Sequence, residues 1–114
     1  MIRGVSTFIV PVKDLARAKA LYQKLLGVEP NMDAPYYVNF HVGDLDIGLD
    51  PHGHAQGMSG SVTYFLVSDI KATVQALTDN GAQIHQAARD VGGGKLIATL
   101  KDADGNLFGL VQLP

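Results

Sequence analysis

The sequence predicts an α+β domain in which one βαβββ unit occurs twice. Each copy has a β-prone segment, an amphipathic helix and further short extended segments, in the same order. Val12–Leu15 of the first copy aligns with Val67–Ile70 of the second. Gly48 and Gly109 align near the ends of the two copies. A repeated order of elements with aligned positions indicates an internal duplication.

The two copies form one predicted domain over residues 1–114. We assign modules to residues 1–51 and 62–114, joined by a flexible polar linker at 52–61, because that stretch is rich in glycine and serine. The chain has 114 residues, of which 46% are hydrophobic. It is therefore long enough to bury a core as a single domain.

The composition excludes several classes of site and partner. There is no cysteine, which rules out disulfides, thiolate metal sites and a cysteine nucleophile, and which suits a reducing compartment. The net charge of −2 provides no basic stripe for nucleic acid. The apolar run Phe8–Val12 is too short for a signal peptide or a membrane span. We therefore expect a cytoplasmic protein that binds neither nucleic acid nor a membrane.

The first module begins with a strand and a helix. Residues 7–12 are β-prone and contain a proline that suits an edge position. Asp14 then suits a helix N-cap, and Gly27 suits the left-handed position just after the helix. The apolar residues expected on the buried face of this helix are Leu15, Ala18, Leu21, Tyr22, Leu25 and Leu26.

A hairpin ends the first module. After a short extended piece around Val28, residues 36–42 and 45–50 are predicted strands, joined by a turn at Gly43 and Asp44. His41 in this hairpin, like His85 later in the chain, is a lone histidine that we expect to be hydrogen-bonded or at the surface.

The second module repeats this order. Residues 62–67 form a predicted strand, and Asp69 begins a helix that ends before Gly81. The extended segments that follow are residues 83–86, 96–101 and 107–113.

Three stretches carry a resemblance to a known family. They are VKDLARAKALYQKLLGVEP, VSDIKATVQALTDNGAQI and the ending DADGNLFGLVQ, which is the most specific of the three. With these stretches the chain resembles the vicinal oxygen chelate superfamily, which includes glyoxalases, bleomycin resistance proteins and extradiol dioxygenases. The resemblance implies two βαβββ modules that form a curled, open, barrel-like mixed sheet around a cavity, in a chain that pairs as a homodimer.

The resemblance also implies where a divalent metal would bind. Metal-dependent members use a His or Gln on the first strand of each module and a Glu or His on its last strand. The matching positions here are Thr7, Gly48, Val62 and Gly109. Because these residues offer at most one weak hydroxyl, we expect no metal and no other cofactor at these positions. Asp50, His52 and His54 lie close together in sequence and are a weaker alternative set of metal ligands.

Strand alternation predicts a mostly apolar ligand cavity with a few polar groups, among them Asp50, Tyr64 and Thr7. Tyr36, Tyr37 and Tyr64 suit stacking on a flat aromatic ligand, the mode that the resemblance to drug-sequestering relatives implies. The predicted ligand-binding residues are Thr7, Ile9, Tyr37, Gly48, Asp50, Val62, Tyr64, Leu107 and Gly109.

The two strand glycines allow two interpretations. Gly48 and Gly109 either clear space in the cavity, or mark bends or bulges in a curled sheet, and the two can hold together.

Three functions fit the sequence. The first is a metal-free binding protein of the glyoxalase and bleomycin-resistance type, which holds an apolar or aromatic small molecule. The second is an enzyme, a metal-dependent lyase, isomerase or dioxygenase with non-standard ligands. The third is a dimerisation module without a ligand. The sequence favours the first because the expected metal ligands are missing.

Overall fold

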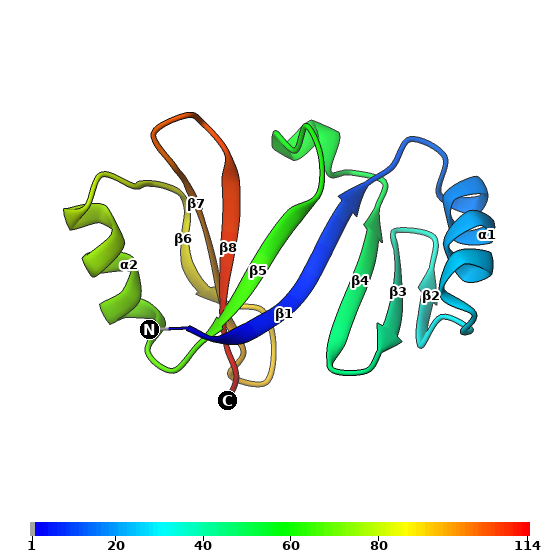
Figure 1. The fold of residues 1–114 in the computed structure, drawn as a ribbon, viewed down its shortest axis with the longest axis horizontal. Helices are drawn as coiled ribbons and strands as arrows, with labels where there is room; N and C mark the ends of the chain where they lie inside the picture. The colour runs from blue at the N-terminus through cyan, green and yellow to red at the C-terminus, as the bar shows by residue number, and fades with distance from the viewer. Residues whose placement is uncertain (1) are drawn as a thin grey trace. The chain divides into compact units, whose positions relative to one another are not determined.

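The computed structural model describes residues 2–114. Within that range the chain forms eight strands, two α-helices and one short 3-10 helix (Figure 1). The elements are β1 (Ile2–Pro11), α1 (Leu15–Leu26), β2 (Met32–Ala34), β3 (Tyr37–Val42), β4 (Leu45–Asp50), η1 (His54–Gln56), β5 (Val62–Val67), α2 (Ile70–Asp79), β6 (Gln83–Asp90), β7 (Leu96–Lys101) and β8 (Leu107–Gln112). The strands form one mixed, unclosed sheet in the order β2-β3-β4-β1-β5-β8-β7-β6. The predicted α+β class is confirmed.

The chain divides into two compact units. The N-terminal unit is Thr7–Val62, and the C-terminal unit is Thr63–Pro114 together with the first part of β1, up to Ser6. Each unit contains one helix and its own part of the sheet.

In the N-terminal unit, β2, β3 and β4 are antiparallel neighbours, and β1 runs parallel to β4. Helix α1 lies along this part of the sheet (Figure 1). The core between them consists of the buried residues Val38, Phe40 and Leu49, with Leu15, Ala18, Tyr22 and Leu26 of the helix packed against them.

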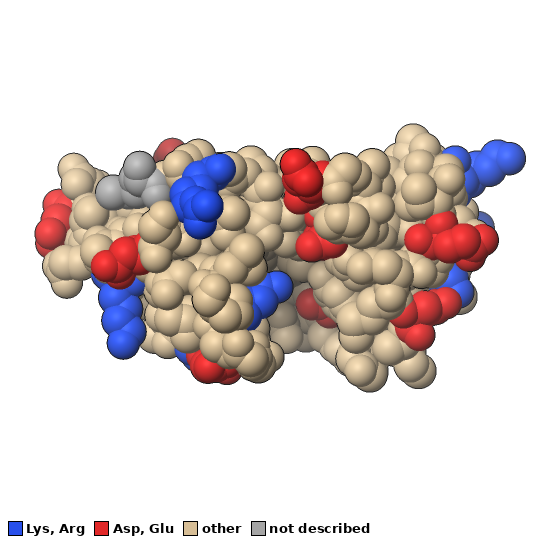
Figure 2. Space-filling view, turned by 90° about the horizontal axis from the view of Figure 1, so that it is seen from below, with Lys and Arg blue, Asp and Glu red and all other residues tan. Residues whose placement is uncertain are grey.

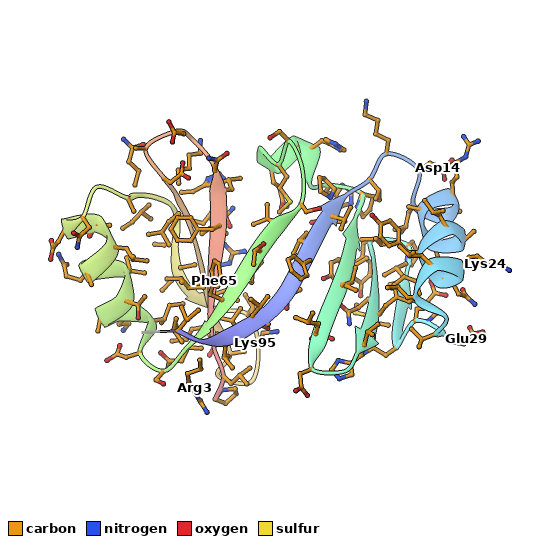
Figure 3. The ribbon with its side chains drawn as sticks, in the orientation of Figure 1. Arg3, Asp14, Lys24, Glu29, Phe65 and Lys95 are labelled. Atoms are coloured by element: carbon orange, nitrogen blue, oxygen red, sulfur yellow. The ribbon has the colours of Figure 1, made fainter. Side chains whose placement is uncertain are left out.

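The caps of α1 are as predicted. The Asp14 carboxylate accepts a hydrogen bond from the backbone N–H of Arg17 at 3.0 Å, and Asp14 lies at the start of the helix in Figure 3. Gly27 ends the helix with a φ of 70°, a left-handed conformation that favours glycine.

The predicted buried face of α1 was too wide. Leu21 and Leu25 have exposed fractions of 65% and 72%. The helix contacts the sheet along a narrow stripe in which Leu15, Tyr22 and Leu26 nearly line up, because their spacings are close to whole turns. Leu21 and Leu25 lie on the flank of that stripe and stay in solvent.

In the C-terminal unit, β5 runs parallel to β8, while β7 is antiparallel to both β8 and β6. Helix α2 covers one face, and the Asp69 carboxylate caps it by accepting from the N–H of Ala72 at 3.1 Å. The buried core between α2 and the sheet consists of Val67, Ile70, Ala98, Leu100 and Leu110, with Phe65 (labelled in Figure 3) packed against it.

Several strand boundaries differ from the sequence prediction. β1 begins at Ile2, and the extended piece expected around Val28 is wrong, because the third element of the module is β2 at Met32–Ala34. β2 is fixed by pairing with β3 and by an ion pair between Lys19 of α1 and Asp33. These are non-local contacts, which local strand patterns do not contain.

The predicted linker forms a compact turn. The Asp50 carboxylate accepts from the N–H of His52 at 2.8 Å, and the N–H of Met58 donates to the carbonyl of Gly53 at 3.0 Å. Gly53 and Met58 are both buried. Residues 52–61 therefore have more structure than their composition indicates.

The stretch DADGNLFGLVQ, which carries the most specific part of the family resemblance, closes the β7–β8 turn and caps α2. The Asp102 carboxylate accepts from the backbone N–H groups of Asp104 and Asn106 and from the Asn106 side chain, all at 2.9 to 3.0 Å. Gly105 completes this turn with a φ of 82°. Gln112, at the other end, accepts from the N–H of Ile70 at 2.8 Å and so satisfies a free amide in the first turn of α2.

The stability that this turn contributes should depend on pH. The Asn106 side chain, with the backbone N–H groups of Asn106 and Asp104, holds the pKa of Asp102 below its ordinary value. A carboxyl whose pKa is lower in the folded state stabilises the fold above its unfolded pKa of about 4, and this contribution disappears as the pH falls through the folded pKa. Asn106→Ala should therefore destabilise the protein at about pH 7, and the difference from the parent should shrink toward about pH 2.

Urea unfolding at the two pH values measures this difference. A destabilisation that is the same at both would mean that Asn106 acts through turn geometry alone and not through the Asp102 charge.

Candidate functional site

Apart from Val62 of β5, the predicted site residues of the N-terminal unit lie on the face of its sheet opposite α1. They alternate along the strands with Val38, Phe40 and Leu49, which pack toward the helix. Residues that pair across neighbouring strands share a face. We call this surface the Gly48 face; its members are Thr7, Ile9 and Pro11 of β1, Asp46, Gly48 and Asp50 of β4, and Tyr37, Asn39 and His41 of β3.

The centre of the Gly48 face is occupied by a tyrosine. A Cβ atom added to Gly48 would lie 1.7 Å from the Tyr37 hydroxyl oxygen and 2.4 Å from Tyr37 Cζ. It would also lie 3.0 Å from Ile9 Cδ1. The far end of Tyr37 therefore fills the volume in which any other residue at position 48 would place its side chain.

The C-terminal unit repeats the arrangement with a different tyrosine. Tyr64 of β5 pairs directly with Gly109 of β8. A Cβ atom added to Gly109 would lie 2.2 Å from Tyr64 Cδ2, 2.4 Å from Cε2 and 2.6 Å from Cγ. The ring, including its attachment point, thus lies against the glycine backbone. We call the surface around this contact the Gly109 face; its members are Tyr64, Leu107, Gly109, Val111 and Thr99.

These contacts explain the two glycines. Neither Gly48 nor Gly109 has a positive φ, and both lie in regular pairing without a register shift. The interpretation of these glycines as bulges is therefore wrong. Each glycine instead provides room for a tyrosine side chain from another strand.

A buried hydroxyl on the Gly109 face lacks a hydrogen bond. Thr99 pairs with Gly109 and is only 6% exposed, and its Oγ1 has no hydrogen-bond partner within residues 2–114. Most buried polar atoms in proteins are hydrogen-bonded to protein or to water. Thr99 Oγ1 is therefore a buried, unsatisfied polar atom beside the Tyr64–Gly109 contact.

The residues at the four implied metal positions do not fit a divalent ion. Thr7 and Val62 supply at most one hydroxyl, and Val62 is 2% exposed. At Gly48 and Gly109 a carboxylate would need the volume that Tyr37 and Tyr64 fill. Across residues 2–114 no three His, Asp or Glu side chains gather closely enough to hold a metal.

The alternative metal ligands are engaged differently. One oxygen of the Asp50 carboxylate accepts from the backbone N–H of His52, and so organises the turn after β4. The side chains of His52 and His54 belong to exposed residues of that turn and its 3-10 helix.

A chain of polar side chains on the Gly48 face went unnoticed in the sequence. The Asn39 amide donates to the side-chain oxygen of Asn31 at 2.9 Å and to Asp46 Oδ1 at 3.0 Å. Asp46 Oδ1 also lies 2.8 Å from His41 Nδ1. His41 and Asp46 are directly opposite each other in the β3–β4 hairpin. The predicted turn at Gly43 and Asp44 contained this signal, because it fixes which residues face each other.

Charges of both signs are scattered over the surface drawn in Figure 2, with tan areas between them and no stripe of one sign. The face shown in this view therefore lacks the basic patch that nucleic-acid binding needs. In the part of the chain that the structure describes, neither helix is long and apolar enough to cross a membrane.

A comparison with protein families identifies the chain. The family model described as Glyoxalase/Bleomycin resistance protein/Dioxygenase superfamily matches residues 4–110. The chain belongs to this superfamily. The resemblance inferred from the sequence is confirmed, and the tyrosine-filled glycine positions are therefore features of a glyoxalase-superfamily protein.

Solved structures of superfamily members share the fold. A glyoxalase/bleomycin resistance protein/dioxygenase superfamily member from Vibrio splendidus 12B01 has a TM-score of 0.74 at 19% identity, covering 98% of each chain. Methylmalonyl-CoA epimerase from Mycobacterium tuberculosis has a TM-score of 0.69 at 19% identity, covering 99% of this chain and 89% of that one.

A variant of Streptomyces coelicolor methylmalonyl-CoA epimerase, in complex with 2-nitronate-propionyl-CoA, has a TM-score of 0.72 at 16% identity and covers 98% of each chain. Identities this low support a shared fold only. Comparison with curated protein sequences gives no significant match.

The predicted site residues of this superfamily member divide between the two units. The N-terminal unit holds Thr7, Ile9, Tyr37, Gly48, Asp50 and Val62, and the C-terminal unit holds Tyr64, Leu107 and Gly109. Within their units the tyrosines contact the glycines, as described above. A single cavity lined by both modules stays a prediction.

Proposed function

We propose that this protein binds an apolar or aromatic small molecule without a metal ion. The observation that carries the proposal is that tyrosine side chains fill the space beside the two glycines at implied metal-ligand positions. Tyr37 lies against Gly48, and Tyr64 lies against Gly109. Aromatic and apolar walls with a few polar groups are typical of small-molecule sites. On the Gly48 face Thr7 and Asp50 supply such groups.

The two tyrosines also support an aromatic or apolar ligand. A phenol ring is a rigid, amphipathic surface that stacks on flat apolar groups, with about 0.5–1.5 kcal/mol beyond the area buried. Tyr37 is half-buried, so part of its side chain is accessible on the Gly48 face.

The second candidate is an enzyme, a metal-dependent lyase, isomerase or dioxygenase. Two methylmalonyl-CoA epimerases share this fold, which favours considering it. It would require a metal held by residues outside the four implied positions, such as Asp50, His52 and His54. The shortage of metal-donating side chains in residues 2–114 favours the binding protein over this alternative.

Metal analysis separates the two candidates. Protein purified without a chelator or affinity tag is offered Zn²⁺, Mn²⁺, Fe²⁺ and Ni²⁺, dialysed, and assayed for elements. We expect far less than one ion per chain to remain, because too few donors converge. A stoichiometric ion that is lost from the triple variant Asp50→Asn/His52→Gln/His54→Gln would contradict the proposal and favour the enzyme.

We further propose that the protein acts as a cytoplasmic homodimer. The absence of cysteine supports a reducing compartment, and the superfamily resemblance supports the dimer. Sedimentation velocity measures the mass in solution, and a monomer at all concentrations would contradict this part of the proposal.

A further inference from the structure

We propose that the ligand of the Gly48 face is a neutral aromatic molecule carrying a hydroxyl group, which donates a hydrogen bond to Nε2 of His41. The proposal rests on the proposed function, because it specifies which small molecule that site accepts. It is carried by the hydrogen-bonded polar chain Asn31–Asn39–Asp46–His41. A purely apolar ligand would make no hydrogen bond to this chain.

The polar chain fixes the orientation of His41. Asp46, as a carboxylate, can only accept hydrogen bonds, so the contact of 2.8 Å makes His41 Nδ1 the donor. In a neutral imidazole the other nitrogen, Nε2, is then an acceptor. Asp46 is itself held in place by the Asn39 amide, and that amide contacts Asn31. His41 therefore presents one defined acceptor.

That acceptor is accessible. The side chain of His41 is 53% exposed, and Asp46 is the one hydrogen-bond partner of His41 within residues 2–114. His41 lies on the same face as Tyr37 and Ile9, because Asp46 and Gly48 are alternate residues of β4. An aromatic ligand resting against Tyr37 and Ile9 can thus place a hydroxyl toward His41.

The charges of the face select a neutral donor. Asp46 and Asp50 both belong to the Gly48 face, and neither has a Lys or Arg partner in the described part of the chain. Two carboxylates disfavour an anionic ligand by like-charge repulsion. The ligand must therefore donate a hydrogen bond to His41 and carry no negative charge. A phenol meets both requirements, since it is neutral and its hydroxyl is a good donor.

Three probes test the proposal by calorimetric titration at neutral pH. 2-Naphthol carries the hydroxyl, 2-methoxynaphthalene has the same ring system without a donor, and 2-naphthoate is an anion. We expect 2-naphthol to bind about tenfold more tightly than the methyl ether, from one hydrogen bond to an oriented acceptor. Naphthoate should bind more weakly than either.

Matched variants locate the effect. His41→Leu should abolish the preference for naphthol over its methyl ether while leaving the ether's affinity within about twofold. Asp46→Asn should reduce the same preference and improve naphthoate binding, because it removes a charge and replaces the carboxylate that Nδ1 contacts by a weaker, neutral acceptor. Asp44→Asn is the control, since it removes an exposed charge in the same hairpin without contacting His41. Circular dichroism confirms that each variant is folded. If His41→Leu does not fold, Asp46→Asn still tests the proposal.

The outcomes distinguish the two proposals. If none of the three probes binds, the proposed function fails, and this inference fails with it. If naphthol and its methyl ether bind equally well, or if His41→Leu and Asp46→Asn keep the preference, the inference is overturned while the binding function stands.

Discussion

Replacing Gly109 by alanine is expected to lower the free energy of unfolding by about 3 kcal/mol, at the upper end of overpacking effects in well-packed interiors. The new Cβ would lie 2.2 to 2.6 Å from three ring atoms of Tyr64, one of which is Cγ. A ring cannot pivot away from a clash at its own attachment point, so β5 or β8 must move. Tyr64 is buried, which leaves little room for that movement.

A double-mutant cycle isolates this contact. Tyr64→Ala alone should cost about 3 kcal/mol through lost packing and the cavity left behind. Gly109→Ala/Tyr64→Ala should cost no more than Tyr64→Ala, because the added methyl group enters the space that the ring has left. Chemical denaturation of the four proteins measures the coupling. Costs that simply add would mean that Tyr64 does not determine the glycine at position 109.

Replacing Gly48 by alanine is expected to affect ligand binding more than stability. The two nearest atoms in its way are Oη and Cζ, at the far end of Tyr37, and a half-buried tyrosine can swing that end aside. We expect a loss of about 1 kcal/mol in the free energy of unfolding. Because the displaced ring no longer supports a ligand on the Gly48 face, 2-methoxynaphthalene should bind about tenfold more weakly.

Gly60→Ala is the matched control for both glycine variants. A Cβ atom at Gly60 would meet nothing within 4 Å, and the residue does not need a left-handed φ. This variant should keep the stability and the affinity of the parent. A Gly48→Ala protein that binds the probe normally would show that Tyr37 does not contribute to the site.

The contrast between the two glycines has a consequence for engineering a metal site. Glutamate at position 109 requires the removal of Tyr64, whereas glutamate at position 48 requires that Tyr37 turn away and that the end of Ile9 shift slightly. Any reconstruction of the superfamily's metal ligands in this chain therefore depends on the tyrosines as well as on the ligands themselves.

The family-specific ending illustrates how a recognisable motif can carry structure in place of chemistry. Asp102, Gly105 and Asn106 close the β7–β8 turn, Leu110 is 1% exposed in the core, and Gln112 caps α2. These roles explain why the stretch identifies the fold so well. They also explain why it says little about the ligand.

The sequence by itself determined the duplicated βαβββ order, the helix caps at Asp14 and Asp69 and the β3–β4 hairpin. These features depend on residue type and on spacings of a few residues, which local propensity, capping and strand alternation govern directly.

Only the tertiary structure decided what fills the glycine positions and what surrounds His41. Alternation predicts the face on which Tyr37 and Tyr64 lie, but not how far each side chain leans across the sheet toward a glycine on another strand. In the same way, the width of the buried stripe on α1 depended on the sheet beneath it, which left Leu21 and Leu25 exposed. Contacts between strands and layers arise from packing of distant segments, and no local pattern in the chain encodes them.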